Sequence, residues 1–125
     1  MPRTVMIVDD SLIMTQKLTA MIRDLGHQVV RVCKSGPEAL RDYPFVRPDI
    51  VTMDITMPGM DGIETMKAIM ATNPQARVIM VTSHGQEAMV LKSLEAGALG
   101  YVLKPVNKDR LAAMIERAMA QMAAA

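Results

Sequence analysis

Short, largely uncharged runs rich in β-branched residues alternate along this chain with longer stretches in which apolar residues recur every three or four positions. The first run covers residues 4–8, and comparable runs cover residues 29–33, 50–53, 77–81 and 100–103. Runs of this length and composition are typical of strands that are buried on both faces. We therefore predict five strands, with a helical stretch after each.

The stretch after the first run has clear helix signals at both ends. Met14, Leu18 and Ile22 recur at helical spacing and predict one apolar face. Ser11 can cap the amino end, and Gly26 can end the helix.

Similar signals predict the other four helices. The second begins after Ser35 and is closed by Pro44 and Pro48, and the third covers about 62–72. The fourth covers about 86–96, and its apolar positions are Val90, Leu91 and Leu94. The fifth carries one inward stripe, made of Leu111, Met114, Ile115, Ala118, Met119 and Met122.

Five strand–helix units with short connections predict an α/β fold. The five-stranded sheet is expected to be parallel and doubly wound, a (βα)5 arrangement with helices on both faces and right-handed crossovers. The pattern indicates one domain over residues 1–125 and leaves the strand order open.

Composition narrows the class of protein. Apolar residues make up 50% of the 125 positions and charged residues 22%, which is typical of a soluble globular domain. Fourteen Met, against one Phe, two Tyr and no Trp, predict a core of flexible aliphatic side chains. The net charge of +1 and the lack of a basic tract argue against nucleic acid as a direct partner.

Two further features bear on the compartment. Cys33 is the only cysteine, so an internal disulfide is excluded and a buried thiol is expected. The apolar run near the amino terminus is too short for a signal peptide or a membrane span. We therefore expect a cytoplasmic protein without membrane insertion.

Polar side chains with possible chemistry follow four of the five predicted strands. Asp9 and Asp10 follow the first strand, Asp54 the third, Thr82 the fourth and Lys104 the fifth. In a parallel sheet the carboxyl ends of the strands share one edge, where ligands bind. If the first and third strands are neighbours, the three carboxylates lie within a few ångströms of one another.

Three adjacent carboxylates repel one another unless a cation offsets their charge. Mg²⁺ prefers oxygen ligands and needs only one or two carboxylates besides waters and phosphoryl oxygens. Lys104 and Thr82 offer an ammonium and a hydroxyl suited to a phosphoryl group. Each residue alone has an ordinary explanation as a helix cap, a strand residue or a loop lysine. As a set they predict a phosphoryl-transfer centre with Asp54 as the acceptor.

Four segments carry a family resemblance: the pair Asp9-Asp10, the segment MDITMPGMDG around Asp54, the pair Thr82-Ser83 and the run at 101–105. As a set they resemble the receiver domain of bacterial two-component response regulators, and most of all the single-domain chemotaxis regulators of the CheY type. The resemblance covers residues 4–122. It implies a flavodoxin-like, CheY-like strand order 2-1-3-4-5, an order for which CheY is itself an example.

The resemblance also implies a phosphoryl donor and a metal. Asp54 would accept a phosphoryl group from a phosphohistidine on a sensor histidine kinase similar to CheA, or on a phosphotransfer protein. Asp9, Asp10 and Asp54, together with the backbone carbonyl of Thr56, would bind Mg²⁺. The chain would be a phosphoacceptor with Mg²⁺-dependent self-phosphorylation and autodephosphorylation rather than an enzyme in the ordinary sense.

Further residues take part in the implied switch. Lys104 and Thr82 would contact the phosphoryl group, and Tyr101 would change rotamer on phosphorylation. The peptide bond between Lys104 and Pro105 would be cis. An exposed face that includes Val90, Tyr101, Lys104 and Lys108 would bind an output target such as a flagellar switch component, in a monomeric chemotaxis protein.

Three other kinds of protein share some of these features. A haloacid-dehalogenase-type phosphatase places a second Asp where Thr56 stands here, and a flavodoxin phosphate would be repelled by Asp9 and Asp10. The third rival, the receiver domain of a longer regulator with a DNA-binding or enzymatic output domain, stays open.

Overall fold

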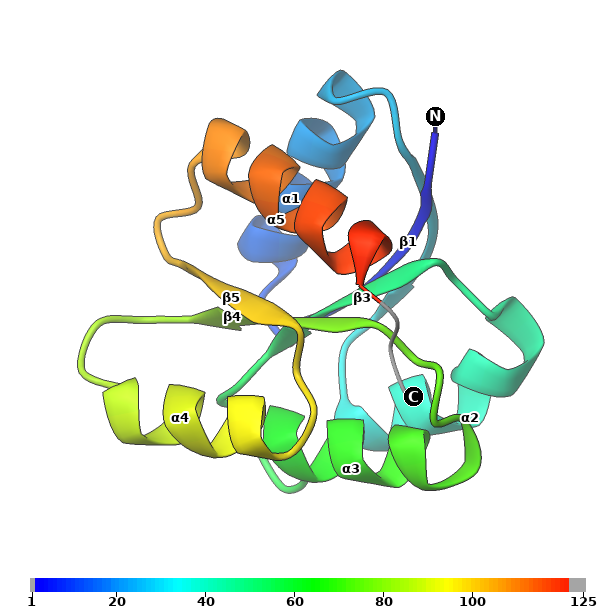
Figure 1. Cartoon of the computed structure of the whole chain (residues 1–125), viewed down its shortest axis with the longest axis vertical. Helices are drawn as coiled ribbons and strands as arrows, with labels where there is room; N and C mark the ends of the chain where they lie inside the picture. Colours follow the sequence, from blue (N-terminus) through cyan, green and yellow to red (C-terminus); the bar gives the residue numbers. More distant parts are fainter. Residues whose placement is uncertain (1, 122–125) are drawn as a thin grey trace.

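A five-stranded parallel sheet forms the centre of the protein and carries helices on both faces (Figure 1). The structure is a computed structural model that describes residues 2–121; Met122, the last residue of the predicted stripe, lies outside the described residues. The strands are β1 (Thr4–Val8), β2 (Gln28–Cys33), β3 (Ile50–Asp54), β4 (Val78–Thr82) and β5 (Gly100–Leu103). The helices are α1 (Leu12–Asp24), α2 (Gly36–Val46), α3 (Gly62–Thr72), α4 (Glu87–Glu95) and α5 (Lys108–Ala120).

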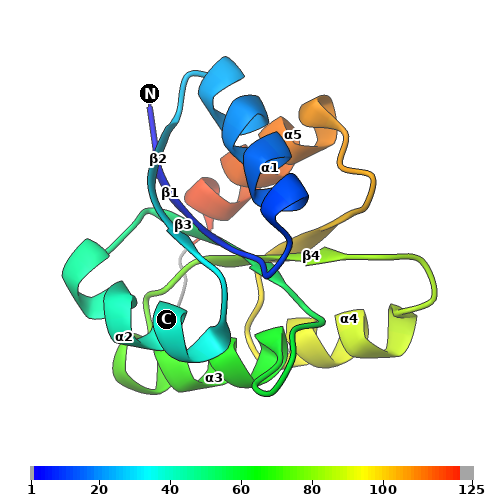
Figure 2. The same cartoon turned by 180° about the vertical axis from the view of Figure 1, so that it is seen from behind.

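The strand order is β2-β1-β3-β4-β5, and every neighbouring pair is parallel. The predicted fold class and the order implied by the resemblance are both confirmed. Helices α1 and α5 cover one face of the sheet, while α2, α3 and α4 cover the other (Figures 1 and 2). Since β1 lies beside β3, with Val8 opposite Met53, the residues that follow these two strands come together.

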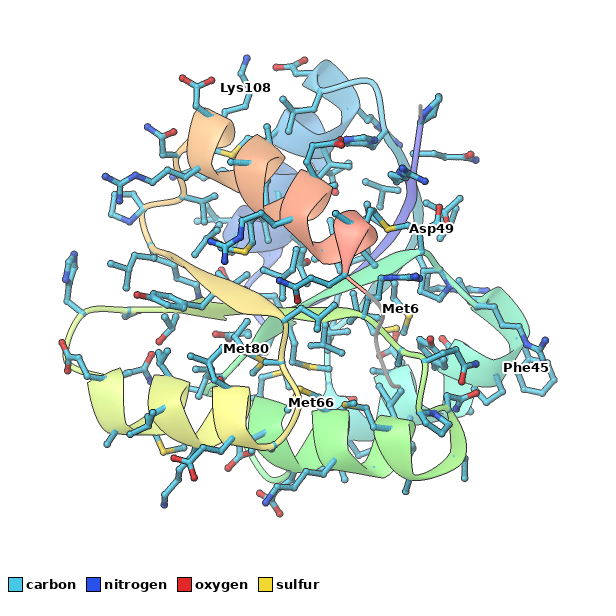
Figure 3. The ribbon with its side chains drawn as sticks, viewed as in Figure 1. Met6, Phe45, Asp49, Met66, Met80 and Lys108 are labelled. Carbon is cyan, nitrogen blue, oxygen red and sulfur yellow. The ribbon has the colours of Figure 1, made fainter. Side chains whose placement is uncertain are left out.

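The core consists of two apolar layers, one on each face of the sheet. Methionines fill much of the layer beneath α2, α3 and α4, where Met6, Met66 and Met80 are fully buried (Figure 3). Each such side chain contributes roughly 1.5–3 kcal/mol by leaving water. The predicted methionine-rich core is therefore confirmed.

The loop from β3 to α3 is held by a cap and by a close backbone contact. Asp61 caps α3 in a capping box with Glu64, which explains why the helix begins at the predicted residue. The Gly62 amide donates to the Ile55 carbonyl at 2.8 Å. A Cβ at Gly62 would collide with the backbone carbonyl of Asp54, so only glycine fits this position.

Two helix predictions were wrong in detail. Pro44 does not close α2, because the Arg47 amide donates to the Tyr43 carbonyl at 2.9 Å and continues the helix past the proline. Of the three apolar positions predicted for α4, only Val90 is buried, whereas Leu91 and Leu94 are exposed. Helix α4 lies near the end of the sheet at which β5 is the outermost strand of the described residues, so the outer flank of α4 stays open (Figure 1).

Candidate functional site

Three carboxylates converge at the carboxyl ends of β1 and β3. Asp9, Asp10 and Asp54 each place a carboxylate oxygen within 4.8 Å of the others. Asp9 is 1% exposed and Asp54 6%, while Asp10 lies at the surface. The Asp9 amide donates to the Cys33 carbonyl at 3.0 Å, and its Oδ1 accepts from the Ser11 amide at 2.9 Å. Backbone bonds thus hold the acidic group at the edge of the sheet.

Lys104 reaches this group from the end of β5. Its Nζ lies 3.3 Å from Asp54 Oδ1 and 3.5 Å from Asp9 Oδ2. The Lys104 amide also donates to the Thr82 carbonyl at 2.7 Å, which ties the ends of β4 and β5 together. The expected cis peptide bond between Lys104 and Pro105 is present. The structure therefore places the Lys104 ammonium beside the carboxylates, and its role toward a phosphoryl group stays a prediction.

One ammonium does not offset the negative charge of the site. Burial, followed by the charge of Asp9, raises the pKa of Asp54 to about 6, although Lys104 acts in the opposite direction. Asp9 Oδ2 is buried and accepts no hydrogen bond from any described residue, since the Lys104 ammonium lies within ion-pair distance but not in hydrogen-bonding geometry. A buried oxygen without a donor and an excess of carboxylates fit a hard divalent cation such as Mg²⁺.

The side chain of Gln86 joins Thr82 to Thr56. The sequence pattern predicts Gln86 only as the first residue of a helix and not as part of the site. Thr82 Oγ1 donates to Gln86 Oε1 at 2.6 Å, and Gln86 Nε2 donates to Thr56 Oγ1 at 2.5 Å. The Ser83 amide also donates to Gln86 Oε1, at 2.9 Å. Gln86 therefore links the β3–α3 loop to the β4–α4 loop beside the acidic group. No motif in the sequence signals this role, because the contact spans 30 positions along the chain.

Tyr101 stands beside a groove between α4 and β5. Its side chain is 41% exposed, and it lines a hollow of about 280 Å³ together with the exposed Leu91 and Leu94.

The predicted partner-face residues do not form one exposed surface. Val90 is buried against the core because it lies on the sheet side of α4. Lys104 is turned toward the carboxylates, and Lys108 Nζ lies 3.9 Å from Asp24 Oδ2 of α1. Of the four residues, Val90 and Tyr101 line the apolar groove between α4 and β5, and of these two only Tyr101 is exposed. The exposed apolar members of that groove on α4 are Leu91 and Leu94 instead, since they lie on its open flank.

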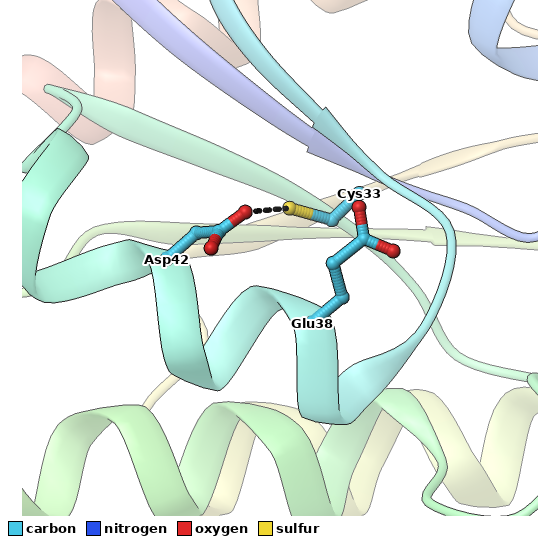
Figure 4. A group of neighbouring side chains, drawn as sticks. All are labelled: Cys33, Glu38 and Asp42. Carbon is cyan, nitrogen blue, oxygen red and sulfur yellow. Dashed lines mark hydrogen bonds between the residues drawn. The ribbon is translucent and has the colours of Figure 1, made fainter.

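A second group of possible ligands lies at the end of β2. Cys33, Glu38 and Asp42 place Sγ and carboxylate oxygens within 4.8 Å of one another (Figure 4). Burial, with added repulsion from Glu38 and Asp42, raises the pKa of Cys33 to about 12. The thiol therefore stays protonated and donates to Asp42 Oδ2 at 3.8 Å, whereas a metal ligand would be a thiolate. Cys33 is buried, as predicted.

Membrane insertion receives no support from the helices. Between residues 2 and 121, none of them combines the length and the apolarity that a membrane crossing requires.

Comparison with known proteins places these features in a family context. Residues 5–116 match the family model of the response regulator receiver domain. The chain is 42% identical over 113 residues to the chemotaxis protein CheY of Listeria monocytogenes, covering 90% of this chain and 95% of that protein. It is 38% identical over 119 residues to the chemotaxis protein CheY of Bacillus subtilis, covering 95% and 99% of the two chains.

A solved structure shows the same fold. The crystal structure of the CheX-CheY-BeF3-Mg+2 complex from Borrelia burgdorferi contains a chain that superposes with a TM-score of 0.85 at 36% identity. The match covers 92% of this chain and 87% of that chain.

Proposed function

Since the chain belongs to the response regulator receiver domain family of two-component systems, we propose that it accepts a phosphoryl group on Asp54 in a Mg²⁺-dependent reaction and then changes its partner binding. The observation that carries this proposal is the site itself. Asp54 ends β3 within 4.8 Å of two further carboxylates and 3.3 Å from the Lys104 ammonium. Receiver domains act as phosphoacceptors and not as classical enzymes, and the proposal places this chain among them.

The acids have two roles in this proposal. Asp9, Asp10 and Asp54, with the Thr56 carbonyl, would hold Mg²⁺, which supplies positive charge to the carboxylates and to the phosphoryl oxygens when bound. A carboxylate oxygen of Asp54 attacks the phosphorus, and the bond from phosphorus to the donor nitrogen breaks. The donor imidazole leaves with the electron pair, and Asp54 becomes an acyl phosphate. With a pKa of about 6, Asp54 is mostly ionised and able to attack at pH 7.

Lys104 and Thr82 stabilise the product. The Lys104 ammonium already lies 3.3 Å from Asp54 Oδ1. In the acyl phosphate the negative charge lies on the phosphoryl oxygens, so the ammonium pairs with one of these instead. Thr82 is the residue after Val81, and Val81 lies opposite Asp54 in the pairing of β3 with β4. A small displacement of the Thr82 loop therefore brings a hydrogen-bond donor to the phosphoryl group.

The switch is a shift between two populations, because phosphate acts only through contacts that differ between the two states. Movement of Thr82 toward Asp54 leaves room on the α4 side, where Tyr101 borders the groove. The Tyr101 ring turns into that space and changes the surface next to Leu91 and Leu94. A beryllofluoride complex in which Tyr101 keeps its present exposure would exclude this part of the proposal.

A kinase and a target complete the proposed pathway. The donor is a phosphohistidine of a sensor histidine kinase similar to CheA, or of a phosphotransfer protein. The target is an amphipathic protein segment, such as one in a flagellar switch component, that packs on Leu91, Leu94 and Tyr101. The relatives named as chemotaxis proteins support this role. We place the protein in the cytoplasm as a single receiver domain over residues 1–125 and as a monomer.

Phosphorylation by a small phosphodonor tests the proposal. With Mg²⁺ the intact mass should rise by one phosphoryl group, and with EDTA it should not. Asp54→Asn should abolish the gain, whereas Asp61→Asn, which alters the helix cap in the same loop, should keep it. Undiminished phosphorylation of Asp54→Asn would refute the assignment. Sedimentation after activation addresses the longer-regulator alternative, since tight dimerisation would favour it.

A further inference from the structure

The side chain of Gln86 joins two loops on either side of the site entrance. Its Oε1 accepts from the hydroxyl of Thr82, the last residue of β4, at 2.6 Å and from the amide of Ser83, the first residue of the β4–α4 loop, at 2.9 Å. Its Nε2 donates to the hydroxyl of Thr56 in the β3–α3 loop at 2.5 Å. Both polar atoms of this side chain are therefore engaged by residues that follow or end the two neighbouring strands β3 and β4.

These bonds do not serve the helix that Gln86 begins. Gln86 occupies the N-cap position of α4, yet its side chain makes no capping bond to the amides of that helix. A side chain that serves a helix end would accept from the second or third amide of the helix. The amide group of Gln86 instead reaches backward along its own loop and across to the neighbouring loop.

The Thr82 hydroxyl has one hydrogen to donate. While Thr82 donates it to Gln86 Oε1, the hydroxyl has no hydrogen for a phosphoryl oxygen on Asp54. Thr82 is almost fully buried, and the other acceptor near its hydroxyl, the Ser83 carbonyl oxygen, lies at 3.4 Å and is much farther away than Gln86 Oε1. Formation of the phosphorylated state therefore requires that the bond from Thr82 to Gln86 break.

We propose that Gln86 is a positioning residue that holds the Thr82 hydroxyl in the resting arrangement and thereby lowers the affinity of the site for a phosphoryl group. This inference rests on the proposed function of Asp54 and Thr82. Gln86 touches neither Asp54 nor the acids around it in the contacts that the structure shows. It acts through Thr82 and, by way of Thr56, through the loop that follows Asp54.

The size of the effect follows from the bond that is broken. One hydrogen bond between neutral groups shifts an equilibrium by roughly twofold to tenfold. Gln86→Ala removes this bond from the resting state only, so the variant should bind beryllofluoride, in excess Mg²⁺, more tightly than the wild type by that factor. Gln86→Glu keeps an acceptor for Thr82, and its affinity should not exceed that of the wild type.

Fluorine NMR titration with beryllofluoride measures these affinities directly. The matched control is Gln75→Ala, the same substitution at an exposed glutamine. Gln75 lies in the turn before β4, at the amino end of that strand and so away from the site at its carboxyl end. Gln75→Ala should bind with wild-type affinity. Thermal unfolding of each variant establishes that it is folded before its affinity is compared.

A double-mutant cycle separates positioning from a general loosening of the loop. In a Thr82→Val background the hydroxyl is absent, so Gln86→Ala should no longer raise the affinity. An increase of the same size in both backgrounds, or no increase with Thr82 present, would overturn the inference. If wild-type protein fails to bind beryllofluoride at all, the proposed function fails. Binding that depends on Asp54 but not on Gln86 would refute only the role of Gln86.

Discussion

Replacing Asp54 by asparagine should stabilise the metal-free protein at neutral pH, although it should abolish phosphorylation. Folding buries the Asp54 carboxylate beside Asp9, and these two effects raise its pKa from 3.8 to about 6. A group whose pKa is raised in the folded state gives its full stability below the unfolded pKa and loses it as the pH rises through the folded pKa. Wild-type stability should therefore fall between about pH 4 and pH 6 because of this group, and Asp54→Asn should lack that fall.

The magnitude follows from the pKa shift. A rise of about two pKa units corresponds to roughly 3 kcal/mol at pH 7, at about 1.4 kcal/mol per unit. We expect about 1–2 kcal/mol, since the site lies at the edge of the sheet near water and the substitution also removes a partner of Lys104. In a domain of this size, a gain of that order raises the melting temperature by roughly 3–10 °C.

Urea unfolding in EDTA at pH 5 and pH 7.5 measures this difference through the transition midpoints. Asp10→Asn is the matched control, because it removes an acid of the same group that lies at the surface. The control should shift the midpoint less than Asp54→Asn. Mg²⁺ should stabilise the wild type and reduce the difference in stability between it and Asp54→Asn. An Asp54→Asn protein that is less stable than the wild type in EDTA at pH 7.5 would refute the electrostatic reasoning.

Three further substitutions test other parts of the structure. Thr52→Val should stabilise the protein by about 1 kcal/mol in urea unfolding, because the buried Thr52 hydroxyl has no hydrogen-bond partner in the described part of the chain; a loss of stability would show that the hydroxyl has one. Gly62→Ala should destabilise by about 2 kcal/mol or more, since its Cβ would meet the Asp54 carbonyl, and a neutral result would contradict that contact. Lys104→Ala should retain Mg²⁺ binding in calorimetry while phosphorylation no longer changes target binding; loss of Mg²⁺ binding would place the ammonium in the metal site.

Local signals in the sequence predict most of the elements. The run at 50–53 and the caps around Asp61 place β3 and α3 within a residue of their positions, because burial and helix capping depend on near neighbours. The strand order depends on pairing between distant segments, so the family resemblance implies it whereas the hydrophobic pattern does not. The prediction that Pro44 closes the helix was wrong, because the bond from the Arg47 amide to the Tyr43 carbonyl continues the last turn past the proline.

The site shows the same division between local and distant contacts. Asp9, Asp54 and Lys104 are predictable because each ends a strand or directly follows one, and the carboxyl ends of parallel strands lie at one edge of the sheet. The bond from Gln86 to Thr56 joins two loops whose spacing no local pattern encodes. The exposure of Leu91 likewise depends on which flank of α4 faces open solvent, and that is decided by the packing of the whole sheet.

A crystal structure of the protein with Mg²⁺ and beryllofluoride tests the central claim most directly. We predict beryllofluoride on a carboxylate oxygen of Asp54, with Mg²⁺ held by the neighbouring acids and the Thr56 carbonyl. Lys104 and the Thr82 hydroxyl should contact fluorine atoms, and Thr82 should no longer donate to Gln86. Beryllofluoride bound away from Asp54, or Mg²⁺ bound without any of the three carboxylates, would contradict the account.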